Sequence, residues 1–546
     1  MIPTTRRSAE PAQSLPAASD SGGGIRGALL GLFPAASAPA VLPLGPWTWR
    51  RRVLVTAAGT AAVLLGAAVL LLRIPGIPSW DTVYSEDYSE FLLGAFRHPW
   101  DLFAQYNGYE QLLPRLVAQL VALLPLADAA KAFACVGALT AAVCALFIFY
   151  ASAGHIRSVT LRLLLAAAVI LLPVAPMEIA DSTVDAPWYL LLAATWAVLW
   201  RPRTRTGMAV AAFLGFAAAS SNSIVVLLAP LLAIRGYVLR RPRDHAVTAG
   251  WLAGCLIQVP VITAAALSGQ SRLVGGQDPR TGPVDRMDSV TFYLHDVVLR
   301  AVGWHLSWRL ESLTSTDWAT LVVAVALAAV LGVLMVTQPG ARPFAVVALA
   351  AGFVFTVVSA SLTPWEASTP VTVGSEGMAR YTALPIFLIE AALIVGVDHV
   401  LRRRRELPAP ADSAPAGPAR AGTGRPRLVT ALRPAVAVTA LVAFLAVSWV
   451  ADFRYQGMRS APSAHAWSPV VAQWRYDCQV SRTGTISVLG TGKGDGSYWT
   501  IPCDRIRFLC RGEVALVRST YANVTSPSER LTSQSETRQT GSFCDF

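Results

Sequence analysis

The stretch RRRVLVTAAGTAAVLLGAAVLLL occupies residues 50–72, where three arginines precede a long run of apolar and small residues. A transmembrane helix needs about 20 predominantly apolar residues to cross the hydrocarbon core of a bilayer. The run meets this length and no small-residue cleavage site follows it, so it predicts a membrane-spanning helix rather than a cleaved signal peptide. Basic residues just before a span are typical of the cytoplasmic side.

The whole chain has the composition of a membrane protein. Of its 546 residues, 54% are hydrophobic and only 14% are charged, and the mean hydropathy is +0.49. Soluble domains carry about 25% charged residues. The net charge of +12 is explained by basic loops beside the apolar runs. We therefore expect an integral membrane protein in contact with lipids, and no nucleic-acid partner.

Apolar runs of similar length recur along the chain, and we expect about eleven of them to span the membrane. The proposed spans are 53–72, 129–150, 160–176, 186–200, 207–220, 223–235, 246–267, 318–336, 344–361, 381–400 and 433–451. The runs 207–220 and 223–235 are short, and only the polar turn at residues 220–223 separates them.

The loops between the proposed spans alternate in charge. With the N-terminus inside, every inner loop is basic, and these loops contain His155, Arg157, Arg201, Arg203, Arg205, Arg235, Arg240, Arg241, Arg243, Arg342 and Arg402–Arg405. The first outer loop, 74–128, is instead acidic. The positive-inside rule thus predicts a multi-pass protein of the cell membrane, with a cytoplasmic N-terminus and an extracytoplasmic C-terminus.

The segments outside the main block 53–400 divide into four parts. Residues 1–52 are rich in Ala, Pro, Ser and Gly and predict a disordered cytoplasmic tail. Residues 401–432 are expected to form a cytoplasmic basic and Pro/Ala-rich linker, which leads to the last span at 433–451. Residues 452–546 then lie outside.

The C-terminal segment contains four of the seven cysteines: Cys478, Cys503, Cys510 and Cys544. Four cysteines in a short outer segment suggest two disulfides, and three pairings are possible. Residues 485–489 and 514–517 are rich in β-formers. The expected fold is therefore an all-α polytopic membrane protein with a small, extracytoplasmic, disulfide-stapled, β-containing C-terminal module.

The first outer loop is too long to be a simple connector. Residues 87–96 place apolar side chains at helical spacing, with Asp87 and Glu90 on the opposite face. Residues 112–124 repeat this pattern and keep Arg115 and Gln119 off the apolar face. We expect two amphipathic helices that lie in the membrane interface.

Asp81 lies just beyond the outer end of the first predicted span, next to Trp80. A carboxylate at the bilayer edge, walled by aromatic rings, is suited to accept a proton as a general base. The simpler alternative is an exposed loop residue or a helix cap. The residue alone favours the simpler alternative.

The surroundings of Asp81 change that balance. The chain resembles the polytopic glycosyltransferases of the GT-C superfamily over about residues 53–400. The resemblance rests on Trp80-Asp81 after the first span, the acidic cluster Glu86-Asp87-Tyr88, the two interfacial helices, and Gly377-Met378-Ala379-Arg380-Tyr381 at the start of a late span. It implies transfer of a hexosyl or pentosyl unit from a polyprenyl-phosphate donor on the outer face of the membrane.

The resemblance also implies roles for particular residues. Asp81 is the candidate base, with Asp87 and Glu86 as further candidates. Arg380, beside Tyr381, is the candidate contact for the lipid phosphate, because a guanidinium binds phosphate through two parallel hydrogen bonds. The alternative for Arg380 is an ordinary interfacial arginine whose charge reaches the headgroups.

Two further outer loops contain candidate donor-binding and metal-binding residues, each of which also has a purely structural interpretation. Arg272, His305 and Arg309 belong to a basic loop at 268–317, which suits either an anionic lipid-linked sugar or lipid headgroups. Glu178, Asp181 and Asp185 lie in a short loop, where some GT-C members hold a divalent metal such as Mg²⁺ or Mn²⁺. This chain has no Asp-x-Asp pair there, and helix capping is the alternative.

The favoured hypothesis is a bacterial membrane glycosyltransferase. It would move sugar from a polyprenyl-phosphate donor to an outer-face glycan, lipid or protein acceptor of the cell envelope. One rival is a transporter or flippase of a lipid-linked intermediate, although such proteins place ionisable residues near the bilayer midplane. The other rival is a non-catalytic scaffold.

Overall fold

The computed structural model describes residues 25–34, 48–84, 86–177, 179–268, 286–362, 379–406, 427–454, 466–480, 485–489 and 498–503. The described chain is mostly helical, as expected. Each segment predicted to span contains a helix, and the bounds are α2 Trp49–Leu71, α5 Ala129–Ala151, α6 Val159–Ile170, α7 Ala186–Leu199, α8 Arg205–Ser221, α9 Ala229–Val238, α10 Ala246–Leu267, α13 Thr316–Thr337, α14 Arg342–Leu362, α15 Ala379–Glu406 and α16 Arg427–Ala451.

Six helical segments in the described ranges are long and apolar enough to cross a bilayer. They are Trp49–Leu71, Leu126–Gly154, Pro242–Leu267, Thr316–Thr337, Arg342–Ser359 and Arg380–Arg403. The other apolar helices are shorter, so their length does not by itself make them spans. The chain is thus a membrane-embedded, multi-pass helical protein.

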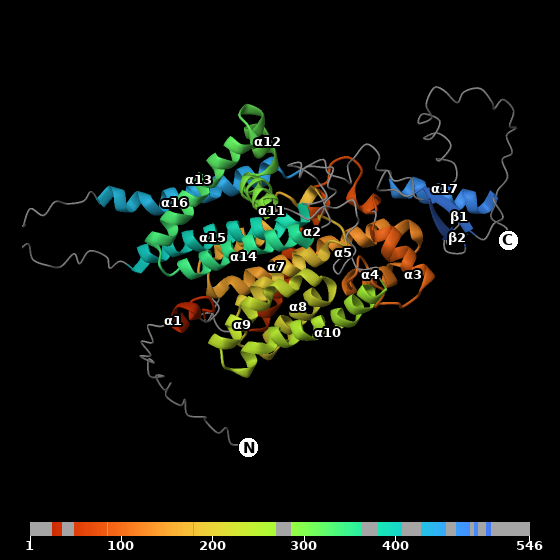
Figure 1. Ribbon diagram of the computed structural model, residues 1–546, viewed down its shortest axis with the longest axis horizontal. Helices are drawn as coiled ribbons and strands as arrows, with labels where there is room; N and C mark the ends of the chain where they lie inside the picture. The colour runs from red at the N-terminus through yellow and green to blue at the C-terminus, as the bar shows by residue number, and fades with distance from the viewer. Residues whose placement is uncertain are drawn as a thin grey trace, which may run out of the picture.

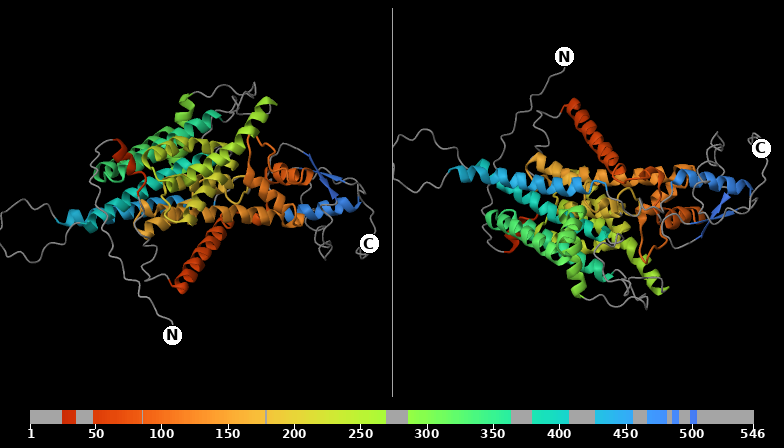
Figure 2. Two further views of the ribbon diagram at one scale, coloured as in Figure 1. Left: turned by 90° about the horizontal axis from the view of Figure 1, so that it is seen from below. Right: turned by 90° about the horizontal axis from the view of Figure 1, so that it is seen from above.

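The centre of the bundle is formed by α7 and α15. Every residue of α7 is buried, as is most of α15 between Ala383 and Val397. Helix α7 packs against α5, α8 and α15, and α15 also packs against α6, α14 and α16. A helix that is apolar all round is stable only when it is enclosed, which explains why these two lie inside. Helix α2 is mostly exposed and leans away from the bundle in Figure 2.

Helices α8 and α10 approach each other more closely than side chains would normally allow. A Cβ atom on Gly250 would lie 1.9 Å from the Ala212 carbonyl oxygen, and one on Gly215 would lie 2.6 Å from the Val247 carbonyl oxygen. Small residues permit such backbone contact between membrane helices. The contact fixes α10, which in turn holds part of the first outer loop.

Part of the N-terminal segment is packed against the bundle. It forms α1, Ile25–Leu30, and continues into Leu32 and Phe33, which are both fully buried. A ring nitrogen of His155 lies 3.1 Å from the Leu32 carbonyl oxygen, and the Arg235 guanidinium lies 5.7 Å from the centre of the Phe33 ring. The composition predicts a disordered tail over residues 1–52, whereas residues 25–34 are ordered because these two apolar side chains find a buried site.

The first outer loop contains the expected pair of helical segments. The first comprises a π-helical turn, Asp87–Leu92, followed by α3, Leu93–Arg97, and the second is α4, Leu112–Val121. Both differ from the expected orientation of their polar residues. Asp87 is fully buried, and Arg115 and Gln119 of α4 also face inward, while Leu116 and Leu120 are exposed. Arg115 and Gln119 turn inward because they find partners within the loop, and Asp87 does so because its partners lie in the segment before α7.

The remaining elements connect the helices of the bundle or pack against them. They are the short helical turns Ser79–Asp81, Leu126–Asp128, Ser152–Gly154, Ala175–Met177, Ser223–Leu228, Pro242–His245 and Arg300–Val302, the helix α11 Arg286–Phe292, the π-helix Tyr293–Leu299, and the helices α12 Trp304–Leu313 and α17 Trp467–Val480. Strands β1, Thr485–Leu489, and β2, Tyr498–Pro502, pair antiparallel. Strand β2 is not among the predicted strands, and the predicted strand at 514–517 lies outside the described residues.

Helix α17 is docked on the first outer loop. The Trp467 indole N–H donates to the Leu126 carbonyl oxygen at 2.8 Å, and its ring packs 5.3 Å from that of Tyr88. A disulfide joins Cys478 to Cys503, one of the three pairings left open by the sequence. Cys510 and Cys544 lie outside the described residues. Figure 1 shows α3, α4 and α17 together at one end of the molecule, and α1 toward the other.

Candidate functional site

Arg380 lies at the start of α15, where the helix meets the end of the molecule that carries the first outer loop. Its Nη1 atom is 3.8 Å from Oδ1 of Asp185, the residue before α7, and its guanidinium is 5.5 Å from the centre of the Tyr381 ring. Asp185 is only 1% exposed. The structure therefore brings together a predicted phosphate contact and a predicted acidic loop residue.

A tight turn of the first outer loop places two tyrosines beside this pair. Tyr106 and Tyr109 exchange backbone hydrogen bonds of 2.8 and 3.1 Å, and Asn107 and Gly108 between them have φ angles of 52° and 89°. Positive φ at both central residues defines the type I′ hairpin turn, for which Asn-Gly is a preferred sequence. The Asn107-Gly108 pair is the sequence signal that predicts this turn.

The positive charge of Arg380 acts on both tyrosines. Burial raises the pKa of Tyr109 to about 12 and also raises the pKa of Tyr106, while the positive charge of Arg380 opposes both shifts. The negative charge of Glu86 adds to the rise at Tyr106. Glu86 is 8% exposed and lies immediately before the π-helical turn. The charges of Glu86 and Arg380 thus both act on the Tyr106 phenol.

Asp87 ties the first outer loop to the segment before α7. Its carboxylate accepts hydrogen bonds from the backbone N–H of Thr183 at 3.1 Å and of Val184 at 2.8 Å, and from the Ser182 hydroxyl at 3.2 Å. These bonds hold the chain that leads to Asp185. The nearby Asp181 accepts a hydrogen bond from the Ser79 hydroxyl at 2.8 Å.

Asp81 is engaged by the C-terminal helix. Its two carboxylate oxygens accept hydrogen bonds from the backbone N–H of Ser468 at 2.8 Å and from the Ser468 hydroxyl at 3.0 Å. Ser468 lies in the first turn of α17, so Asp81 satisfies one of the backbone donors that a helix start leaves without a partner. This is the helix-capping alternative considered for Asp81.

The other predicted donor contacts lie elsewhere or are not described. His305 binds Asp452 through its backbone N–H at 2.9 Å and its Nδ1 at 2.6 Å, and Arg309 is exposed on the same helix, α12. Helix α12 packs mainly against α13 and α16. Arg272 and Glu178 lie outside the described residues.

For a divalent metal, the described parts of the chain contain no group of three His, Cys, Asp or Glu side chains close enough to act as ligands. Asp181 and Asp185 instead contact Ser79 and Arg380. The residues around Arg380 therefore support anion binding more directly than cation binding.

Comparison with protein-family models, with curated proteins and with solved structures gives no match for this chain.

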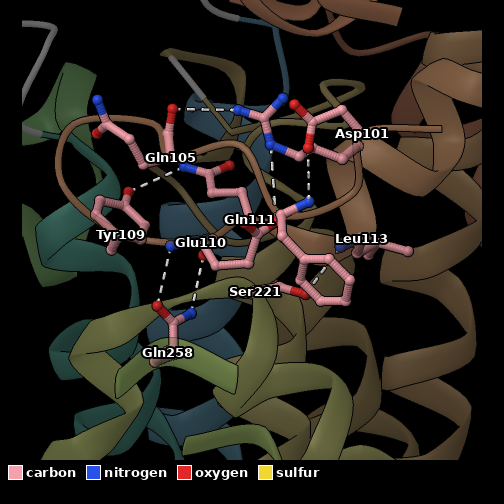
Figure 3. A network of polar contacts seen from close by, with 10 residues as sticks. Asp101, Gln105, Tyr109, Glu110, Gln111, Leu113, Ser221 and Gln258 are labelled. Carbon is pink, nitrogen blue, oxygen red and sulfur yellow. Dashed lines mark hydrogen bonds and ion pairs between the residues drawn. The ribbon is translucent and has the colours of Figure 1, made fainter. Parts of the chain in front are cut away.

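Glu110 forms a buried polar network next to the hairpin turn (Figure 3). Its side chain is fully buried, and its Oε1 lies 3.7 Å from Nε of Arg115. Gln258 of α10 binds both the N–H and the carbonyl of Glu110, at 3.0 and 2.8 Å. Gln111 donates to the Tyr109 hydroxyl at 2.9 Å. The network fixes the turn to the bundle, and the acidic composition of the first outer loop does not single out Glu110.

Burial raises the pKa of Glu110 to about 8, and the positive charge of Arg115 opposes the rise. Asp101 adds a smaller like-charge effect. Because the folded state favours the neutral carboxyl, its stabilising contribution is complete below the unfolded pKa near 4.5 and is lost as the pH rises to about 8.

We expect Glu110→Gln to flatten the pH dependence of stability. Between pH 5 and about 8.5 the wild-type protein should lose about 4 kcal/mol more stability than the variant. The measurement is the melting temperature in detergent across this pH range. Parallel curves for the two proteins would show that Glu110 does not titrate there.

Proposed function

We propose that this chain is a membrane glycosyltransferase of the GT-C type, which moves a sugar from a polyprenyl-phosphate donor to an outer-face acceptor of the bacterial cell envelope. The observation that supports it is the convergence of Arg380, Glu86 and the tyrosines 106 and 109 at one end of the helical bundle. A guanidinium for phosphate and a carboxylate for a hydroxyl proton are the groups that this reaction requires.

In the proposed topology the N-terminus is cytoplasmic and the site faces outward. In it all eleven predicted segments cross, including the apolar helices that are shorter than a full span. The Cys478–Cys503 disulfide supports this orientation, because disulfides persist in oxidising compartments outside the cytoplasm. Asp81 links the disulfide-bearing C-terminal segment to the loop that contributes to the site.

The chemistry assigns one step to each group. The oxygen of an acceptor hydroxyl attacks the anomeric carbon of the sugar, and the bond from that carbon to the phosphate oxygen breaks. The electron pair leaves with the polyprenyl phosphate, whose growing charge Arg380 stabilises. Glu86 accepts the hydroxyl proton. Asp185 orients the guanidinium, and Asp87 holds the segment that carries Asp185.

Binding of a lipid phosphate tests this assignment. Arg380→Gln is expected to weaken binding of a polyprenyl-phosphate sugar about 10- to 100-fold, the loss that accompanies a charge-assisted hydrogen bond. The matched control is Arg309→Gln, an exposed arginine on α12, which should change the affinity less than twofold. Binding is measured with the full chain in nanodiscs. Equal losses in the two variants would contradict the assignment.

A carrier of a lipid-linked intermediate is the second candidate. Glu390 favours it, because this fully buried carboxyl lies in α15, within a candidate span, and contacts the Trp449 indole N–H at 3.1 Å. Ionisable groups inside a membrane span commonly mark transport pathways. A carrier would lose lipid translocation in liposomes on Glu390→Gln, whereas the proposed transferase would keep its turnover.

A further inference from the structure

The hairpin turn carries two aromatic side chains that are connected to the proposed phosphate contact. Tyr106 packs on Phe91 of the π-helical turn, Asp87 of that turn holds the chain before Asp185, and Asp185 pairs with Arg380. The rings of Tyr106 and Tyr109 pack with their centres 6.4 Å apart, and Tyr106 also packs 5.4 Å from Phe91. Both tyrosine side chains are only half-buried. Tyr381, whose ring lies next to the Arg380 guanidinium, is itself packed 5.2 Å from Trp188.

The position of these two rings is fixed from three directions. The type I′ turn fixes the backbone conformation between Tyr106 and Tyr109, so both side chains are attached to a short and rigid segment. Gln258 of α10 binds both backbone groups of Glu110, the residue after the turn. Gln111 donates to the Tyr109 hydroxyl. A surface held in this way loses little conformational entropy when a ligand binds to it.

We propose that the rings of Tyr106 and Tyr109 form the sugar-binding wall of the site and pack against a glycosyl ring whose phosphate is bound by Arg380. This inference rests on the proposed function. A sugar ring presents C–H groups on its faces, and an aromatic face is their electrostatic complement. The phenol hydroxyls add polar contacts at the edge of the ring, as is usual where an apolar wall orients a polar ligand.

The test compares lipids with and without the sugar. The full chain is placed in nanodiscs and titrated with polyprenyl phosphate and with polyprenyl-phosphate glucose, mannose and arabinose. Tyr106→Leu and Tyr109→Leu should each weaken binding of the preferred glycosylated lipid about 3- to 10-fold, the fold-change that corresponds to one aromatic contact. Binding of the bare lipid should change less than twofold. The matched variants Tyr106→Phe and Tyr109→Phe keep the ring and should retain most of the affinity.

The outcomes separate this inference from the proposed function. Arg380→Gln should weaken both kinds of lipid, because both carry the phosphate. If the leucine variants weaken both lipids equally, or if the wild-type protein binds bare and glycosylated lipids with the same affinity, the sugar-binding wall is wrong and the phosphate site stands. If the wild-type protein binds neither kind of lipid, the proposed function and the wall are both overturned.

Discussion

Asp87→Ala is expected to destabilise the protein by about 3 to 5 kcal/mol. The substitution leaves two buried backbone N–H groups, those of Thr183 and Val184, and the Ser182 hydroxyl without the acceptor that they share. Each unsatisfied buried donor costs about 1 to 3 kcal/mol. The measurement is the thermal unfolding of the purified protein, followed by a tryptophan signal in detergent.

Two further variants serve as controls for Asp87→Ala. Asp87→Asn keeps a side-chain oxygen that accepts a hydrogen bond, so its loss should be clearly smaller. Glu90→Gln changes an exposed carboxylate three residues away and should leave the melting temperature nearly unchanged. If Asp87→Ala unfolds at the same temperature as the wild-type protein, the carboxylate does not hold the first outer loop to the chain before α7.

Glu86→Gln is expected to reduce sugar transfer about 10²- to 10⁴-fold, the range contributed by a positioned general base. Glutamine has nearly the same shape but does not accept the hydroxyl proton. The fold should be retained, so the melting temperature serves as the control. Turnover is measured as radiolabel that leaves a polyprenyl-phosphate sugar for an acceptor or for water.

Asp81→Asn provides the comparison for Glu86→Gln. Asp81 caps α17 through Ser468, so its replacement should loosen the C-terminal helix and lower turnover less than tenfold. Asp81 was the first choice for the base by its position after the first span. If Asp81→Asn abolishes turnover while Glu86→Gln leaves it nearly unchanged, the choice based on chain position is correct and Glu86 is not the base.

Much of the helical architecture was predictable because it follows from local composition. The run at 53–72 becomes α2, Trp49–Leu71, and the other ten apolar runs also contain helices. The position of Arg380 at the start of a late helix was predictable, because Gly377 precedes the apolar run that begins at Tyr381 and contains Pro385. Hydropathy reports the length and polarity of such segments directly.

The partners of the polar residues were not predictable, because they are brought together only by folding. Asp87 lies at helical spacing opposite an apolar face, yet it is buried by the segment 182–184, which is distant in sequence. In α4, Arg115 and Gln119 turn inward toward Glu110 and the Trp100 backbone. The pattern of polar and apolar residues along one helix does not predict which neighbouring segment will provide hydrogen-bond or ion-pair partners for its polar side chains.

The most direct test of the central claim is to locate a bound donor by photocrosslinking. A polyprenyl-phosphate sugar with a photoreactive group on the sugar is bound to the wild-type protein in nanodiscs, irradiated, and mapped by mass spectrometry. We predict labelled peptides from residues 86–109 and from the start of α15 near Arg380. Labelling that falls instead on the opposite end of the bundle, around His155 and Asp398, would contradict the account.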